Sequence, residues 1–352
     1  MELSKILTSM VKKKASDIIL KAHSPVCMRI NSELVKEGDS VSEKDMDEIV
    51  REIMASAQKQ VTKGQNETVF AFSMEGRRFR ASFFMERGSP VIVVRAVNTA
   101  IPDFNGLNLP AKVMESWCNE KRGLILITGT TGSGKSTTVA SMLEHINKNL
   151  AKHILTLEDP IEFMFEDKKS IVSQREVRID TESFQKALEY IMLQSPDIIF
   201  IGDIRSADVM STAMIAAETG QLVIANLHTI NTSHSIERMV NFFQPHQHQE
   251  IRIQLSLLLK GVLSLRLVPL KDGSGRIPAC EVLVPTPTIV ELIREGKINE
   301  IEYYIKDGNL YNMQTFDQAL VNLYKQDKIT KEAAVSYAER RDELIMGLKD
   351  LR

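Results

Sequence analysis

The stretch from Gly123 to Val139 constrains this 352-residue chain more than any other. Its centre, Gly129 to Ser136, reads Gly-Thr-Thr-Gly-Ser-Gly-Lys-Ser and fits the phosphate-binding loop pattern G-x-x-x-x-G-K-[ST]. The apolar run Leu124 to Ile127 before it predicts a buried strand, and the run Ser136 to Leu143 after it predicts a helix. Because a phosphate-binding loop needs this strand–loop–helix context, a chance glycine-rich turn explains the motif poorly.

Each residue type in the loop has a physical role. Glycines let backbone N–H groups curve around phosphate oxygens without Cβ collisions, and the helix N-terminus adds partial positive charge. We expect Lys135 to reach the terminal phosphates and the Ser136 hydroxyl to bind Mg²⁺. The predicted nucleotide contacts are Gly129, Thr130, Thr131, Gly132, Ser133, Gly134, Lys135, Ser136 and Thr137.

Composition excludes several classes of protein. Hydrophobic residues make up 43% and charged residues 26%, which is typical of a globular protein in water. The net charge of −2 argues against a nucleic-acid partner, since phosphate neutralisation needs surplus Lys and Arg. The three cysteines are far apart, which disfavours disulfides or a zinc site. No apolar run approaches the ~20 residues of a membrane helix, so we expect a cytoplasmic protein that meets the membrane through partners.

The chain divides by pattern into two regions and a linker. Residues 1–100 predict a small α+β domain, with a helix at Leu3 to Met10, a helix capped by Ser42 and several strand-like runs. A strand ending in a turn at Asn31 and Ser32 is one of these. Residues 101–111, which contain Pro102, Gly106 and Pro110, predict a linker. Residues 112–352 form the second domain.

Strands and helices alternate in the second domain. Three apolar runs predict strands: Ile154 to Leu157, Asp197 to Ile201 and Leu222 to Leu227. Each run is followed by polar residues, as expected when the carboxyl ends of parallel strands line a ligand crevice. Beyond Ile236 we expect mostly helices, with predicted helices at Ile251 to Leu263, Ile289 to Glu295, Phe316 to Gln326 and Lys331 to Leu348.

The polar residues after these strands are the candidate catalytic groups. Phosphoryl transfer to water needs Mg²⁺, an oriented water and positive charge on the transition state. Asp203 lies where an acid that handles Mg²⁺ is expected, while Glu158 and Glu162 follow the preceding strand. His228 ends the next strand and could contact the terminal phosphate. A single acid is usually a solvated residue and a single histidine a structural one, but several at strand ends beside the loop favour a site.

Four segments together resemble the type IV pilus retraction ATPases, the PilT/PilU family of secretion-type motors. They are Ile154 to Glu162, Ser173 to Val177, Asp197 to Arg205, and Ala216 to Gly220 through Leu227 to Thr229. The N-terminal run Ala15 to Ile18 through Met28 to Asn31 resembles the PAS-like domain of that family. Asn312 to Leu320 is similar to the PilU branch, and Pro287 to Glu295 departs from the PilT signature Ala-Ile-Arg-Asn-Leu-Ile-Arg-Glu.

The resemblance implies a fold, an activity and partners. It implies a RecA-like ATPase domain that binds ATP and Mg²⁺, with a PAS-like N-terminal domain. It further implies a homo-hexamer that acts on an inner-membrane pilus platform protein, powers retraction and twitching motility, and works as a PilU-like accessory motor beside a paralogous ATPase. Carried over, Glu158 and Glu162 lie in the acidic box, His228 in the histidine box, and Arg80 and Arg95 at arginine positions that close over nucleotide.

One residue departs from the family pattern. The Walker B box of the family usually reads Gly-Glu, whereas this chain has Gly202-Asp203. Aspartate reaches roughly 1.5 Å less, and a shift of about 1 Å in near-attack geometry can cost on the order of 10²-fold in rate. We therefore expect Asp203 to handle Mg²⁺ but to orient the attacking water poorly, which predicts a slow motor or an accessory one.

Two alternative functions stay open. The first is an ATPase for pilus assembly or type II secretion, although such proteins typically carry a longer N-terminal region and a four-cysteine module that this sequence lacks. The second is a nucleotide-binding scaffold subunit with little turnover, which the aspartate at position 203 favours. Comparing the ATPase rate of the chain with that of a Lys135→Ala variant separates the scaffold from a motor.

Overall fold

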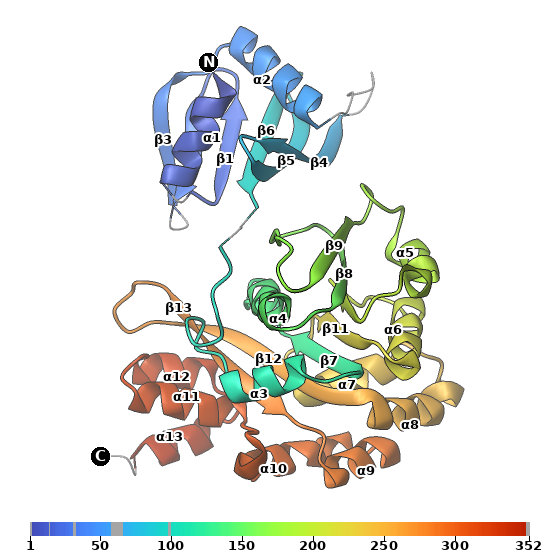
Figure 1. The fold of residues 1–352 in the computed structure, drawn as a ribbon. Coiled ribbons are helices and arrows are strands. Elements are labelled where there is room, and N and C mark those ends of the chain that lie inside the picture. Colours follow the sequence, from blue (N-terminus) through green and yellow to red (C-terminus); the bar gives the residue numbers. More distant parts are fainter. Residues whose placement is uncertain (1, 14, 31–32, 58–65, 98–99, 350–352) are drawn as a thin grey trace. The chain divides into compact units, whose positions relative to one another are not determined.

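The computed structural model describes residues 2–13, 15–30, 33–57, 66–97 and 100–349. The expected turn at Asn31 and Ser32 lies outside these residues. The chain forms two compact units (Figure 1). The first comprises residues 1–99 together with 162–164, and the second comprises residues 100–161 and 165–352.

The described part of the first unit is a six-stranded antiparallel sheet with helices on one face (Figure 1). Its elements are α1 (Leu3–Lys12), β1 (Asp17–Lys21), β2 (Pro25–Ile30), β3 (Glu33–Ser40), α2 (Glu43–Ser56), β4 (Glu67–Met74), β5 (Arg77–Glu86) and β6 (Ser89–Ala96). The strands lie in the order β3-β2-β1-β6-β5-β4. Apolar side chains of α1 and α2 share one core with alternate strand residues, and a capping box at Ser42 begins α2.

The second unit is built on a seven-stranded sheet in its described part, in the order β13-β12-β7-β11-β10-β8-β9. The strands are β7 (Gly123–Thr128), β8 (His153–Glu158), β9 (Ile171–Glu176), β10 (Ile198–Ile201), β11 (Leu222–Leu227), β12 (Leu259–Pro269) and β13 (Arg276–Leu283). All neighbouring pairs are parallel except β12 with β13. The parallel strands therefore all end at one edge of the sheet.

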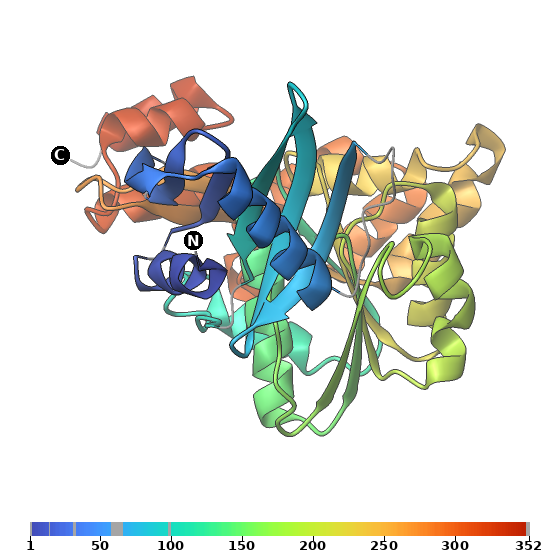
Figure 2. The ribbon, with the colours of Figure 1, turned by 90° about the horizontal axis from the view of Figure 1, so that it is seen from above.

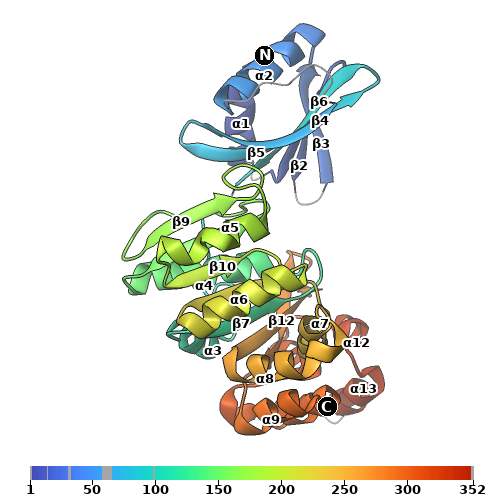
Figure 3. The same ribbon diagram turned by 90° about the vertical axis from the view of Figure 1, so that its right-hand side faces the viewer.

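Helices cover both faces of this sheet, which is why its central strands are apolar throughout. On one face lie α3 (Ala111–Cys118) and α4 (Lys135–Asn149). On the other lie α5 (Phe184–Ile191), α6 (Ala207–Thr219), α7 (Thr232–Val240), α8 (His248–Leu258) and α9 (Pro287–Glu295), as Figure 3 shows. Phe104, within the expected linker, is buried in the same core as α3 and stacks on His145 of α4.

A smaller helical layer packs on the β12–β13 end of the sheet. It contains α11 (Phe316–Lys325), α12 (Lys331–Tyr337) and α13 (Arg341–Lys349), which follow α10 (Ile301–Lys306). Figure 2 shows α11 to α13, in red, at the opposite end of the second unit from α5 and α6. Among the helices described, none is both long and apolar enough to span a bilayer.

The structure corrects two of the expected helices. The predicted helix Ile251 to Leu263 ends at Leu258, and β12 begins at Leu259. A strand buried on both faces reads as a continuous apolar run, which periodicity alone does not separate from a buried helix. Gly261 lies at a register shift in the pairing of β12 with β7, where a Cβ would lie 2.0 Å from a Trp117 ring atom. The predicted helix Lys331 to Leu348 is two helices, broken after Tyr337.

Candidate functional site

The phosphate-binding loop connects β7 to α4 and keeps a tight backbone path. Gly129 has φ 146°, and a Cβ there would lie 2.4 Å from Ser133 Oγ and 2.7 Å from the Leu265 carbonyl oxygen. Gly134, with φ 98°, is the N-cap of α4. The first turn of α4 therefore presents its free N–H groups at the carboxyl edge of the sheet, where an anion is favoured.

Lys135 is buried and lies inside the curve of the loop. Its Nζ donates hydrogen bonds to the carbonyl oxygens of Gly129 at 2.7 Å and Thr130 at 3.0 Å. The same Nζ is 3.4 Å from Nδ1 of His228. The loop thus holds an ammonium group at its mouth, between backbone carbonyls and the end of β11.

The strand order places three of the predicted acid and histidine positions beside the loop. β11 neighbours β7, β10 neighbours β11, and β8 neighbours β10. Since all four strands are parallel, His228, Asp203 and Glu158 follow the loop in that order along one edge. Residues that are far apart in the sequence therefore meet because of the topology.

Asp203 is buried and shared between two basic partners. Its Oδ2 accepts a hydrogen bond from Arg205 Nε at 2.5 Å and is 3.2 Å from His228 Nε2. Hydrogen bonding to Asp203, together with its charge, raises the pKa of the Arg205 guanidinium above its ordinary value. The other oxygen, Oδ1, is buried and makes no hydrogen bond to any described residue. This oxygen is available to a donor or cation that enters the site.

Glu158 is buried next to Asp203 at the end of β8. Its Oε1 accepts hydrogen bonds from Thr156 Oγ1 at 2.7 Å and from Gln174 Nε2 of β9 at 3.2 Å. The ends of β8 and β10 approach closely, because a Cβ on Gly202 would lie 3.2 Å from Glu158 Cα. Hydrogen bonds therefore fix the position of the Glu158 carboxylate, and the close approach of the two strand ends requires a glycine at position 202.

The remaining predicted residues are not brought to this edge within the second unit. Glu162 is exposed and belongs to the short segment grouped with the first unit. Arg80 and Arg95 lie opposite one another on β5 and β6 of the first unit. Arg95 pairs with the buried carboxylate of Asp17 at 2.7 Å. Their part in a nucleotide site stays a prediction.

A cavity of about 490 Å³ lies beside the loop, within the second unit. Its walls include Thr137 and Thr138 from the first turn of α4, Arg276 at the start of β13, and Lys328 between α11 and α12. It is large enough for a nucleoside next to a phosphate cradle. The segment Asn105 to Leu109, within the expected linker, forms another wall.

Sequence reasoning missed several residues that contact the site. Arg205 belongs to a segment quoted for the family resemblance, and its position two residues after Asp203 could have been a signal. Gln174 reaches Glu158 only because β9 pairs with β8, which no local pattern indicates.

Comparisons with known proteins agree with this geometry. The type II/IV secretion system protein family matches residues 1–343. The type IV pilus ATPase PilU of Pseudomonas aeruginosa is 39% identical over 351 residues, covering 99% of this chain and 92% of PilU. The retraction ATPase PilT of the same organism is 36% identical over 336 residues, covering 95% of this chain and 97% of PilT.

A crystal structure of the pilus retraction motor PilT with bound ADP superimposes with a TM-score of 0.89 at 39% identity, covering 98% of this chain and 99% of that one. These findings confirm the resemblance and the RecA-like fold class with its N-terminal domain that the motifs indicate. The chain belongs to the type II/IV secretion system protein family and, within it, to the type IV pilus retraction ATPases of the PilT/PilU group.

Proposed function

We propose that this chain hydrolyses ATP with Mg²⁺ and uses the energy to retract type IV pili. One observation carries the proposal: His228 lies between the loop lysine, at 3.4 Å, and Asp203, at 3.2 Å. A loop lysine, a histidine and an acid at the ends of three adjacent parallel strands can supply the phosphate contacts, the Mg²⁺ ligand and the water orientation that phosphoryl transfer to water requires. The names of the relatives support pilus retraction as the use of that energy.

The nucleotide would be held at two places in the second unit. Backbone N–H groups of the loop and Lys135 would bind the β- and γ-phosphates, because the loop leads into the N-terminus of α4, where an anion is favoured. The backbone path is tightest at Gly129, where there is no room for a Cβ atom. The cavity beside Thr137 and Thr138 would take the sugar and base. Both places adjoin the first turn of α4, which is consistent with one continuous ligand.

The donor set fits a magnesium ion. Ser136 supplies a hydroxyl at the start of α4, and Asp203 supplies the buried Oδ1 that makes no hydrogen bond to a described residue. Oxygen ligands of this kind suit Mg²⁺, which when bound neutralises charge on the phosphates. Asp203 and Glu158 would orient the attacking water, and His228 would contact the γ-phosphate and keep Asp203 in place.

We further propose a ring of six copies, by analogy with the motor family. Arg80 and Arg95 of the first unit would add positive charge to that of Lys135 and Arg205 in the second unit. The pairing of Arg95 with Asp17 fixes that guanidinium within the first unit. The platform protein of the pilus machine and a paralogous ATPase are the proposed partners.

A second candidate is a nucleotide-binding scaffold that turns over little. It is favoured by the short acid at position 203 and by the contact of that acid with Arg205 at 2.5 Å. If the chain is a scaffold, the Asp203 carboxylate is engaged by Arg205 and does not orient a water molecule.

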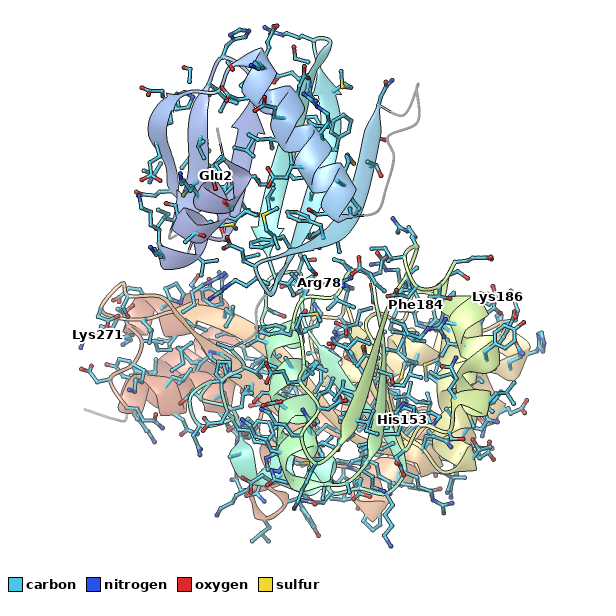
Figure 4. All side chains as sticks on the ribbon, turned by 45° about the horizontal axis from the view of Figure 1, so that its top comes forward. Glu2, Arg78, His153, Phe184, Lys186 and Lys271 are labelled. Atoms are coloured by element: carbon cyan, nitrogen blue, oxygen red, sulfur yellow. The ribbon has the colours of Figure 1, made fainter. Side chains whose placement is uncertain are left out.

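One substitution separates these readings. Lys135→Ala should lower the steady-state ATPase rate of the purified chain by about 10³-fold, because it removes the cation that contacts the terminal phosphates. Lys186→Ala is the control, since Lys186 is an exposed lysine at the start of α5 (Figure 4). Equal rates for the wild type and Lys135→Ala would favour the scaffold.

The cellular experiment uses the same variants. In cells that lack the native gene, the wild-type chain and Lys186→Ala should restore pilus retraction, and Lys135→Ala should not. Repeating the assay with and without a paralogous retraction ATPase tests the accessory role. Restoration by Lys135→Ala in both backgrounds would contradict a motor driven by its own hydrolysis.

A further inference from the structure

A cluster of buried polar side chains lies behind the candidate site, where the catalytic proposal makes no use of it. We call it the polar seam. None of its members is more than 9% exposed, and four are fully buried. Its members are Thr128, Thr229, Thr232, Ser235, Ser264 and Glu281.

Three members form a straight row across three strands. Ser264 of β12 is in register with Thr128 of β7 on one side and with Glu281 of β13 on the other. The Oγ atoms of Thr128 and Ser264 are 2.6 Å apart. Since successive residues alternate between faces, the row shares the face of Leu126, Val262 and Leu283, which is the face that α7 covers.

The first turn of α7 docks on this row through hydrogen bonds. Glu281 Oε1 accepts from the backbone N of Thr232 at 2.8 Å and from its Oγ1 at 2.7 Å. One turn on, Ser235 Oγ donates to the carbonyl oxygen of Asn231 at 2.6 Å and lies 2.6 Å from Thr229 Oγ1 and 3.3 Å from Thr128 Oγ1. Figure 3 shows α7 lying beside β12. Glu281 therefore satisfies a helix N–H that has no partner inside α7.

Both ends of the seam adjoin the site in the sequence. Thr128 immediately precedes Gly129, the first residue of the phosphate-binding loop, and Thr229 immediately follows His228. The seam thus ties the strand that carries the loop to the segment that carries the histidine. A shift of α7 along the row would move the segment that carries His228. It would therefore change the 3.4 Å distance between Lys135 Nζ and His228 Nδ1.

A carboxylate in this position is costly for stability alone. Burial raises the pKa of Glu281 to about 7, although the hydrogen bonds from Thr232 lower it. The charged groups that face it are Arg266 of β12, which lowers this pKa, and Glu339, between α12 and α13, which raises it. An apolar residue of similar volume would remove this cost.

We propose that Glu281 and Ser235 are positioning residues for hydrolysis, which hold α7 in the one register that places His228 between Lys135 and Asp203. This inference rests on the proposed ATPase function. Neither residue touches the nucleotide in this account. Both act through His228, so their effects should depend on that histidine.

The experiment is a double-mutant cycle on the purified full chain. Glu281→Leu removes the acceptor and should lower kcat by about 30-fold while changing the KM for ATP less than about threefold. Ser235→Ala should act in the same direction. Glu281→Gln keeps the acceptor and should stay within about threefold of the wild type. Val282→Ala is the matched control, because Val282 is the next residue of β13, is fully buried and faces the opposite core.

The background variant is His228→Ala, or His228→Gln if the alanine variant falls to the rate of Lys135→Ala. In that background Glu281→Leu should cause no further loss of kcat. If Glu281→Leu lowers kcat by the same factor in the His228 background as in the wild type, the inference is overturned, because the residue then has a general structural role. A Glu281→Gln variant as slow as Glu281→Leu would also overturn it. A wild-type rate equal to that of Lys135→Ala would instead contradict the proposed function itself.

Discussion

The two sides of the nucleotide crevice differ in how they are built. On the loop side, the end of β7, the loop and the start of α4 form one continuous segment, Gly123 to Asn149, and Lys135 bonds to carbonyls of its own loop. On the acidic side, Glu158, Asp203 and His228 lie at the ends of three separate strands and are held through side chains: Asp203 contacts His228, and Glu158 accepts a hydrogen bond from Gln174 of β9.

This difference determines which substitutions each side of the crevice tolerates. The loop side depends on backbone conformation, so it is sensitive to a Cβ added where the backbone is closely packed, as at Gly129. The acidic side depends on the length and direction of side chains, so it is sensitive to a single methylene. The loop side has every residue that phosphate binding requires, whereas the acidic side carries Asp203 where glutamate is usual in the family.

The largest expected effect is on the loop side. Gly129→Ala should abolish nucleotide binding and lower turnover by at least about 100-fold, because its Cβ would lie 2.7 Å from the Leu265 carbonyl oxygen, at φ 146°. Gly273→Ala, in the turn between β12 and β13, is the matched control: φ is 71°, but a Cβ there meets no atom within 4 Å. It should cost about 1 kcal/mol and leave binding in place. Thermal unfolding and nucleotide titration measure both, and equal losses would contradict the difference in packing.

The next effect is on the acidic side. Asp203→Glu should raise kcat by about tenfold, because the longer side chain brings the carboxylate nearer to a water at the γ-phosphate. The affinity for nucleotide should change little, since the loop is untouched. Steady-state ATPase assays at saturating ATP test this. If the two proteins hydrolyse ATP equally fast, the shorter acid is not the limiting element.

The third effect is on stability behind the site and not on turnover. The pKa of Glu281 is raised from 4.5 to about 7 in the folded chain, mainly by burial. Its charge therefore destabilises the fold progressively as pH rises from about 4.5, and fully above about 7. Glu281→Gln removes that charge, so the variant should match the wild type near pH 4.5 and gain about 3 kcal/mol above pH 7.

Thermal unfolding at several pH values measures this gain, and for a chain of this size it corresponds to several degrees in Tm. Glu144→Gln serves as a control of opposite sign. Burial disfavours the charge of Glu144, but hydrogen bonds from Lys168 and Lys148 outweigh it and lower the pKa. Its contribution is lost as pH falls, so that variant should lose stability at neutral pH. A Glu281→Gln gain that does not vary with pH would contradict the burial of a charged carboxylate.

Much of the fold and site follows from local pattern. The phosphate-binding loop, the strands that end at Glu158, Asp203 and His228, and the helix capped by Ser42 all have signals within a few residues. Buried parallel strands followed by polar residues carry this information, because burial requires apolar runs and only the strand ends can be polar.

What the sequence could not predict depends on contacts between distant segments. The first residues of β12, Leu259 to Leu263, were predicted as the end of a helix because a short apolar run fits either structure, and only the place of β12 between β7 and β13 decides it. The polar seam likewise cannot be predicted from the sequence, since Thr128, Ser264 and Glu281 are far apart in the chain and become neighbours only through strand register. Single serine, threonine and glutamate residues give no sign of burial.

The central claim is that holding nucleotide and hydrolysing it are functions of opposite sides of one crevice. Asp203→Asn tests it most directly, because it preserves the shape of the side chain and removes its charge. ADP and ATP affinity and kcat should be measured on the same preparation. We predict a dissociation constant within about fivefold of the wild type and a kcat lowered by at least about 100-fold. Loss of nucleotide binding, or hydrolysis at the wild-type rate, would contradict the claim.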